Sequence, residues 1–286
     1  MRSVIFLLLT AVLAHAAVSP EKIENVRGLL RDHKLAEAES ATKVLLAAHP
    51  AESQVHALLG RIYTAQGDAE AAVKACEKAV ELAPTISEYQ HQLGEAYGFA
   101  AQKAGMLSMM GLAKKSRIAY EKAVELDPMN LDARSSLMSF YQMAPSMLGG
   151  GVDKAYVQAA EIKKLDPVRG RIAHGMIYAG EKKFAEAFAE FEAVLETAPD
   201  HYSALYQFGR AAALSGDRID RGMETLKKCL TVSPSPGSPE HDAVQWRLGN
   251  LWEAKGDKSA ARAAYEAALA INRNFKQAIE SLKKLN

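Results

Sequence analysis

The stretch Val55-His-Ala-Leu-Leu-Gly60-Arg-Ile-Tyr63 decides the fold, because its pattern returns along the chain. It recurs as Tyr89-Gln-His-Gln-Leu-Gly94-Glu-Ala-Tyr97, as Leu205-Tyr-Gln-Phe-Gly209 and as Gln245-Trp-Arg-Leu-Gly249-Asn-Leu-Trp252. A second pattern with the helical period follows the first copy, Ala72-Val-Lys-Ala-Cys76-Glu-Lys-Ala79-Val-Glu-Leu-Ala-Pro84. The distance from Gly60 to Gly94 is 34 residues. A fixed period of this length predicts stacked helix pairs.

The recurrent positions have distinct packing roles in such a stack. Glycines are expected where the two helices of a pair cross closely, at Gly60, Gly94, Gly175, Gly209 and Gly249. Small alanines are expected to face them, at Ala38, Ala72, Ala155, Ala187 and Ala261. Prolines are expected to end the second helices, because proline cannot continue the helical hydrogen-bond ladder. They stand at Pro50, Pro84, Pro128, Pro167, Pro199 and Pro234.

These positions together resemble the tetratricopeptide repeat, a helix-turn-helix unit of 34 residues. The resemblance covers residues 19–274 and implies an all-α, right-handed α-solenoid of about seven repeats. The repeats are expected near residues 19–52, 53–86, 87–130, 131–167, 168–201, 202–241 and 242–274, with a capping helix at 275–286. Residues 17–286 are expected to form a single domain. The long third repeat and the following Ala-Pro-x-x-x-Gly-Gly-Gly turn are similar to a group of uncharacterised exported bacterial proteins, and this similarity implies no activity.

The first 16 residues have the features of a signal peptide. Arg2 precedes an uncharged run from Val4 to Ala14, and Ala14-His15-Ala16 matches a cleavage site. The alternative is a membrane anchor, but a run of 11 residues is shorter than the roughly 20 needed to cross a bilayer. We therefore expect an exported protein, in the periplasm or, as the second choice, secreted. No transmembrane segment is expected after cleavage.

Composition excludes several classes of function. The chain has 35 basic and 34 acidic residues, so it lacks the positive charge of a nucleic-acid binder. Two cysteines cannot form a disulfide scaffold or a four-cysteine zinc site, and Cys76 and Cys229 are predicted to be buried thiols. No catalytic or phosphate-binding motif is present. Gly149-Gly150-Gly151 is interpreted as a turn into a helix capped by Asp153, with an anion site as the alternative. We expect no enzyme activity, no cofactor and no metal site.

Two insertions interrupt the period. Ten residues are added within Ala100–Lys115, and five are added around Met143–Val152. Three hypotheses stay open for the methionines that they contain. The insertions pack on each other as a small satellite core, or they form an adaptable surface for an apolar partner segment, with Met106, Met109 and Met110 as contacts. The third hypothesis is a Cu(I) site, since Met106 and Met109 share a helix face.

The first helices are expected to line the concave face of the solenoid, where a partner would bind. The candidate contacts there are Arg61, Glu95, Phe99, Arg169, Tyr206, Arg210, Trp246, Arg247 and Asn250. Tyr206, Arg210, Trp246 and Arg247 have the composition of a binding hot spot. The alternative is a solvated surface with arginine stems lying on aromatic rings. The proline-rich connector Ser233–Pro239 is interpreted as a spacer.

The sequence therefore predicts an exported, non-enzymatic adaptor that binds a protein or an extended peptide. Binding is expected in the concave groove or at the methionine-rich edge of repeats 3 and 4. The alternative is a carrier of a small apolar ligand or Cu(I) at that edge. No nucleic acid is expected as a partner, and the oligomeric state stays open.

Overall fold

The computed structural model describes residues 18–235 and 237–285, and within these ranges the regular structure is helical without a strand. The expected signal peptide at 1–16 lies outside the described residues. The all-α fold class is confirmed. In chain order the helices are α1 (Pro20–Arg31), α2 (Leu35–Ala48), α3 (Ser53–Gln66), α4 (Ala69–Leu82), α5 (Ser87–Lys103), α6 (Met106–Leu126), α7 (Leu131–Met143), the 3-10 helix η1 (Ser146–Leu148), α8 (Val152–Leu165), α9 (Pro167–Gly180), α10 (Phe184–Thr197), α11 (Tyr202–Ser215), α12 (Ile219–Cys229), α13 (His241–Ala254), α14 (Lys258–Ile271) and α15 (Lys276–Leu285).

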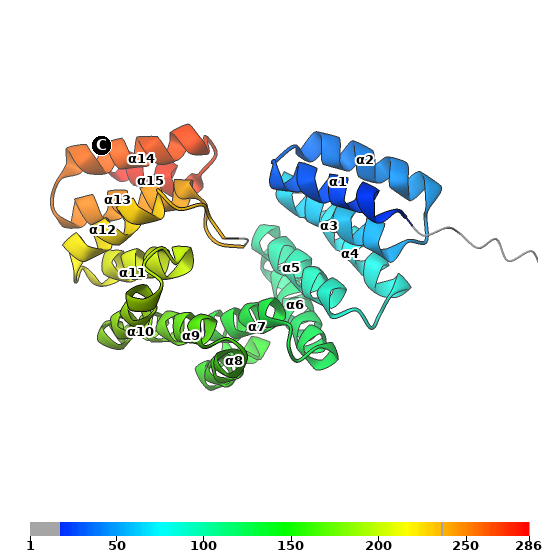
Figure 1. The fold of residues 1–286 in the computed structure, drawn as a ribbon, viewed down its shortest axis with the longest axis horizontal. Helices are drawn as coiled ribbons and strands as arrows, with labels where there is room; N and C mark the ends of the chain where they lie inside the picture. Colours follow the sequence, from blue (N-terminus) through cyan, green and yellow to red (C-terminus); the bar gives the residue numbers. More distant parts are fainter. Residues whose placement is uncertain (1–17, 236, 286) are drawn as a thin grey trace, which may run out of the picture. The chain divides into compact units, whose positions relative to one another are not determined.

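The helices follow one another as antiparallel pairs, from α1 with α2 to α13 with α14, and α15 packs on α14 (Figure 1). The chain divides into two compact units, residues 1–133 and residues 134–286, with the boundary inside α7. We call these unit 1 and unit 2 and describe each by itself. The single domain expected for residues 17–286 stays a prediction.

The regular spacing of the glycines reflects close packing within each pair, and the nearest side chains are larger than the expected alanines. A Cβ added at Gly249 would come within 3.0 Å of the Tyr265 ring, and one added at Gly175 would come equally close to Phe191. The same relation joins Gly60 to Cys76, Gly94 to Tyr120 and Gly209 to Leu226. Ala72 does face Gly60 as expected, since its carbonyl oxygen would lie 3.6 Å from the added Cβ. At all five glycines, however, the nearest atom belongs to another residue of the second helix, for which the glycine makes room.

Local signals in the sequence account for the helix ends. Asp68 caps α4 through the Ala71 amide at 3.0 Å, and Asp257 caps α14 through the Ala260 amide at 2.9 Å. Pro167 differs from the expectation, because it is the first residue of α9 rather than only the stop after α8. Asp153 also differs. It lies in the first turn of α8, and Gly151 is at the cap position.

The ten-residue insertion lengthens a helix pair. In the preceding pair α3 and α4 have 14 residues each, whereas α5 has 17 and α6 has 21. The three extra residues of α5 and the seven of α6 account for the whole insertion, so the α5–α6 hairpin is a longer copy of an ordinary pair. The second insertion forms η1 and the glycine turn before α8, where a Cβ on Gly150 would overlap the Ala144 carbonyl.

Each unit has its own buried residues. In unit 1, Val26, Val55 and Ile62 are fully buried in one cluster, and Cys76 lies with Tyr97 in another. In unit 2 the largest cluster joins α9 to α13, and the Phe188 and Phe208 rings lie 4.8 Å apart at its centre. Cys229 belongs to this cluster. Both cysteines are buried free thiols, as predicted.

Gly249→Ala tests the close packing within a pair. The new methyl group would meet the fully buried Tyr265 ring, so we expect a loss of about 1–3 kcal/mol in the free energy of unfolding. The matched control is Gly111→Ala in α6, which meets no atom within 4 Å and is expected to gain about 0.5–1 kcal/mol from helix propensity. Urea unfolding measures both. Equal effects in the two variants would contradict the packing role.

Thiol labelling tests the burial of the cysteines. Burial raises the pKa of Cys76 to about 12 and the pKa of Cys229 to about 11, so neither forms the reactive thiolate near neutral pH. We expect Ellman's reagent to label neither thiol in the native protein and to label both in guanidinium. Rapid labelling of one thiol in the folded protein would show that its helix pair is not packed as described.

Candidate functional site

A groove of about 580 Å³ lies within unit 2, where the ends of α7 and α9 face α11. Its apolar wall includes Met143, Val152, Met176 and Pro239, and its polar groups include Gln142 and Arg210. The remaining lining residues are Ser139, Gly180, Glu181, Tyr206 and Gln207. Because α7, α9 and α11 are all first helices of their pairs, the groove lies on the side of the stack where a partner was expected.

Gln142 ties two walls of this groove together. Its Nε2 donates a hydrogen bond to the Met176 carbonyl oxygen at 2.9 Å, which joins α7 to α9. A Cβ on Gly180 would come within 3.0 Å of the same nitrogen, so the glycine makes room for the amide. This contact therefore fixes the position of the Gln142 side chain in the groove wall without any partner present.

One arginine, Arg210, lines the groove, and a second, Arg247, lies near enough to act on its charge. Arg210 donates from Nη1 to Gln207 Oε1 at 3.5 Å, and the Arg247 guanidinium lies 4.1 Å from the centre of the Trp246 ring. Burial, and then the neighbouring positive charge of Arg247, lowers the pKa of Arg210. Among residues 18–235 and 237–285, no carboxylate forms an ion pair with either guanidinium. Two adjacent cations without a counter-charge favour an anionic ligand.

Glu181 at the rim of the groove does not balance this pair. Its Oε2 accepts a hydrogen bond from the Tyr156 hydroxyl at 2.5 Å and lies 3.2 Å from Lys183 Nζ. The Tyr156 hydroxyl, followed by Lys183, lowers the pKa of Glu181. Its negative charge is therefore already compensated.

The predicted hot spot is only partly assembled. Tyr206 is 6% exposed and belongs to the core, although it reaches the groove wall. Trp246 packs against the C-terminal part of the chain. Its Nε1 donates a hydrogen bond to Ser281 Oγ of α15 at 3.1 Å, and its ring contacts the Phe275 ring. Tyr206 is thus buried and Trp246 is half-buried, and whether either residue contacts a partner stays a prediction. Only packing between neighbouring pairs decides which flank of a first helix is covered.

The other two candidates in unit 2 lie outside the groove lining. Asn250 accepts a hydrogen bond from the Tyr265 hydroxyl at 3.3 Å, a contact within its own helix pair. Arg169 is exposed and forms an ion pair at 3.6 Å with Asp166, which caps the same helix. Neither of them lines the groove with Arg210.

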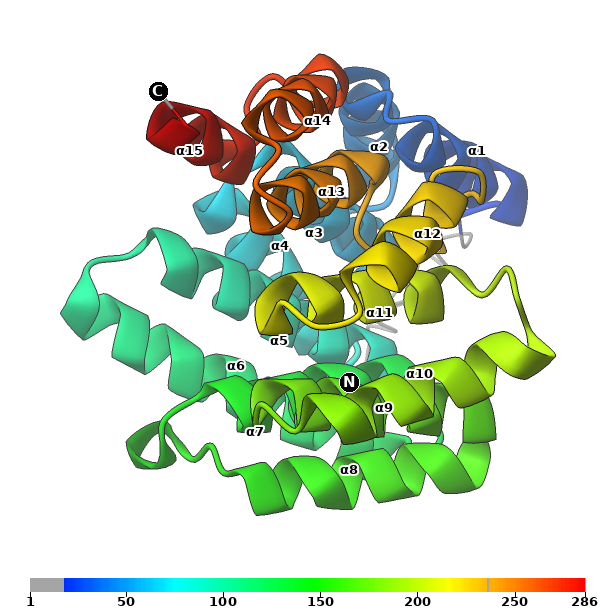
Figure 2. The same cartoon turned by 90° about the vertical axis from the view of Figure 1, so that its left-hand side faces the viewer.

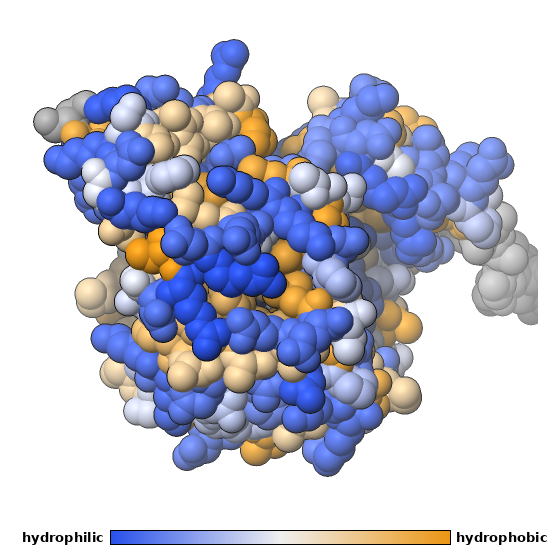
Figure 3. Space-filling model, turned by 60° about the vertical axis from the view of Figure 1, so that its left-hand side comes forward, coloured by the Kyte–Doolittle hydropathy of each residue, from blue (hydrophilic) through white to orange (hydrophobic). Residues whose placement is uncertain are grey.

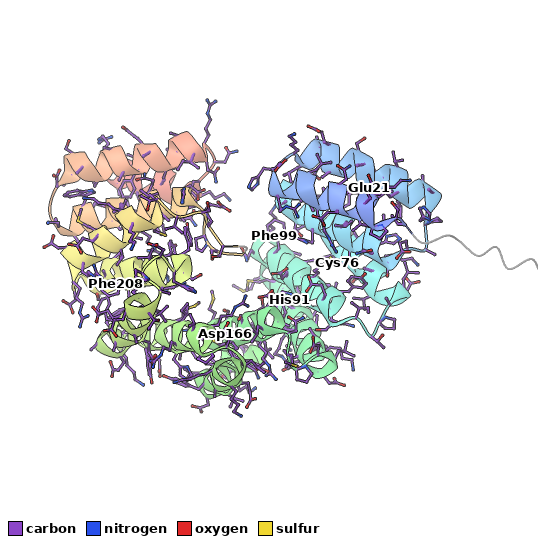
Figure 4. The ribbon with its side chains drawn as sticks, in the orientation of Figure 1. Glu21, Cys76, His91, Phe99, Asp166 and Phe208 are labelled. Carbon is purple, nitrogen blue, oxygen red and sulfur yellow. The ribbon has the colours of Figure 1, made fainter. Side chains whose placement is uncertain are left out.

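In unit 1, Arg61 and Glu95 line a small pocket of about 200 Å³ together with Gln92. Next to it, the buried His91 ring lies between two carboxylates of its own helix, with Glu88 3.9 Å from Nδ1 and Glu95 3.7 Å from Nε2. Figure 4 labels His91 on the ribbon. Burial disfavours the charged ring, but Glu88, Glu95 and Asp132 outweigh burial and raise the pKa of His91. The described residues hold no group of three His, Cys, Asp or Glu side chains placed to bind a metal.

The remaining candidates lie on the α5–α6 hairpin. Phe99 is half-buried, and Lys103 Nζ lies 4.5 Å from the centre of its ring. Met106 is 77% exposed and Met109 is 38% exposed, whereas Met110 is half-buried. The two insertions belong to different units, so the satellite-core hypothesis stays untested, and so does the Cu(I) hypothesis.

Sequence reasoning missed Val152, Gly180, Glu181 and Pro239 as groove residues. Pro239 was interpreted as part of a spacer, yet its carbonyl oxygen accepts a hydrogen bond from the Tyr202 hydroxyl at 2.7 Å. This bond holds the end of the connector against α11. The only signal in the sequence was Tyr202 at the start of a first helix, and a tyrosine alone does not indicate which group accepts its hydrogen bond.

Stability against pH tests the surroundings of His91. A raised pKa in the folded protein means that the protonated ring adds stability fully below the ordinary pKa of about 6.5. This stability is lost as the pH rises through the folded-state pKa. We therefore expect the difference in unfolding free energy between wild type and His91→Gln to shrink from pH 5.5 to pH 8.5 in urea titrations. Glu88→Gln should weaken this trend. A difference that does not vary with pH would contradict the charge pairing.

Comparisons with known proteins agree with the repeat architecture. Residues 53–86 and 168–201 match one family model described as tetratricopeptide repeat, and residues 230–283 match a second one. Superkiller complex protein 3 of Homo sapiens is 23% identical over 91% of this chain and 18% of its own length. The Mus musculus protein of the same name is 21% identical over 91% of this chain and 19% of its own length. The chain thus spans less than a fifth of these relatives.

Solved structures show the same fold. A tetratricopeptide repeat protein from Parabacteroides merdae has a TM-score of 0.67 at 18% identity, covering 93% of this chain and 97% of that one. The Cut9–Hcn1 hetero-tetramer of APC/C has a TM-score of 0.62 at 14% identity, covering 92% of this chain and 48% of that one. A thermophilic TPR protein of Thermus thermophilus has a TM-score of 0.57 at 19% identity, covering 67% and 97%. The chain contains tetratricopeptide repeats, stacked as the helix pairs of an all-α solenoid.

Proposed function

We propose that the protein is a non-enzymatic scaffold whose unit 2 groove binds an extended, acidic segment of a partner protein. The observation that carries this proposal is the pair Arg210 and Arg247, which lies beside a preformed groove and has no carboxylate partner among the described residues. The repeat fold is consistent with this role, since such solenoids present extended binding surfaces.

Binding would use two kinds of contact. The guanidinium groups would donate charge-assisted hydrogen bonds to a side-chain or terminal carboxylate, each worth about 1.5–3 kcal/mol. The exposed Met143, with Met176, Val152 and Pro239, would receive an apolar side chain of the same segment. Because the Gln142 contact already shapes the groove, the scaffold would lose little backbone entropy on binding.

We also propose that the protein acts after export, in the periplasm or outside the cell. This rests on the signal-like residues 1–16 of the sequence. No helix in the described part of the chain is long and apolar enough to cross a membrane. Fractionation of cells that express the full chain or a chain starting at residue 17 tests this. Export of both forms alike would contradict the assignment.

Selection of random 12-residue peptides on immobilised protein tests the groove. We expect enriched peptides to contain Asp or Glu next to an apolar residue. Arg210→Gln and Arg247→Gln should each weaken the affinity by about tenfold or more, because each removes a charge-assisted bond. Fluorescence anisotropy with a labelled enriched peptide measures the affinity.

The matched control is Arg221→Gln, which removes an exposed arginine of α12 that is already paired with Glu224 at 3.0 Å. This variant should bind as wild type does. Enriched peptides that lack carboxylates, or that bind the Arg210 and Arg247 variants as tightly as wild type, would contradict the proposal.

A further inference from the structure

The lengthened α5–α6 hairpin of unit 1 presents an apolar end that its own unit does not cover. Figure 2 shows the two helices running antiparallel, with their connection at the left edge of the view. The seven extra residues of α6 lengthen that helix by about 10 Å. Met106 and Leu107 form the first turn of α6 and are 77% and 89% exposed.

Apolar residues continue along the outer side of α6. Ser116, Ala119, Tyr120 and Ala123 are the buried residues of this helix and mark its inner side. By the helical period of 3.6 residues, Leu107, Met110, Lys114 and Ile118 lie on the opposite side. Ile118 is exposed and Met110 is half-buried. Figure 3 shows that one face of the molecule also carries hydrophobic areas between hydrophilic ones.

The same hairpin end is positively charged. Between Glu95 and Glu121 the sequence has no acidic residue, but it has Lys103, Lys114, Lys115 and Arg117. Arg117 is paired with Glu121 at 2.7 Å. Lys114 and Lys115 form no ion pair among the described residues, and Lys115 Nζ lies 5.0 Å from the centre of the Tyr97 ring. A chain with a net charge of only +1 thus places these two lysines roughly two helical turns from the exposed Met106 and Leu107.

We propose that this hairpin end docks onto a membrane surface of anionic phospholipid. The lysines lie about 10 Å along the helix from the exposed apolar side chains. This spacing matches the roughly 5–10 Å to which apolar side chains enter the head-group region of a membrane. Met106 and Leu107 would enter the boundary of head groups and acyl chains while Lys114 and Lys115 contact the phosphates. Binding of a protein segment to this end is the alternative that the experiment below separates from membrane docking. Attachment is reversible, because few side chains insert.

Co-sedimentation with vesicles tests the proposal. The probe is phosphatidylcholine with about one third phosphatidylglycerol, and the comparison is phosphatidylcholine alone. We expect the protein to bind the anionic vesicles, to bind neutral vesicles at least tenfold more weakly, and to be released by salt. The double change Met106→Glu with Leu107→Glu should abolish binding. Lys114→Gln and Lys115→Gln should each weaken it roughly fivefold.

Met129→Glu is the matched control, because Met129 is a methionine of unit 1 that is 71% exposed but follows Asp127 and Pro128 rather than a basic cluster. It should bind as wild type does, and circular dichroism should show the same melting for all variants. Binding to neutral vesicles at equal strength, no binding to anionic vesicles, or equal loss in Met129→Glu would overturn the proposal. Arg210→Gln should keep full vesicle binding, so this test and that of the groove fail separately.

Discussion

The close approach of two helices at a glycine is the constraint on which the structure depends. In five pairs a glycine of the first helix leaves space that a side chain of the second helix fills. The five side chains are Cys76, Tyr120, Phe191, Leu226 and Tyr265. Each contact sets how near the two axes come, and so which residues of the pair remain on the flanks. Since each pair buries its flank against the next, small errors in this distance would propagate along the stack.

The groove of unit 2 follows from this packing. Large side chains of the second helices fill the space within each pair. Polar and flexible side chains of the first helices α7, α9 and α11 can therefore line the groove. Gly180 likewise leaves space for a neighbouring side chain, because a Cβ at this position would clash with the Gln142 amide. Arg210 lines this groove and Arg247 lies near it, and no carboxylate of the described residues pairs with either, so their charge is available to a partner.

The α5–α6 hairpin shows how the same architecture gains a second surface. Its insertion adds whole turns to two helices, so the pair keeps its packing and simply becomes longer. Leu112 still packs against the unit 1 core, but Met106 and Leu107 in the first turn of α6 stay exposed. A helix pair can therefore be lengthened without changing the packing between its original turns. The residues of the added turns can then vary without altering the groove of unit 2.

The sequence by itself determined the repeat, the all-α fold, the burial of both cysteines and the size of each insertion, because these depend on local period, helix stops and residue volume. Only the tertiary structure decided what faces Gly249, that Trp246 is taken by the C-terminal helix and that Pro239 joins the groove wall. These contacts join residues some 16 to 37 positions apart. Their partners follow from the angle and distance between neighbouring helices, which no local pattern encodes.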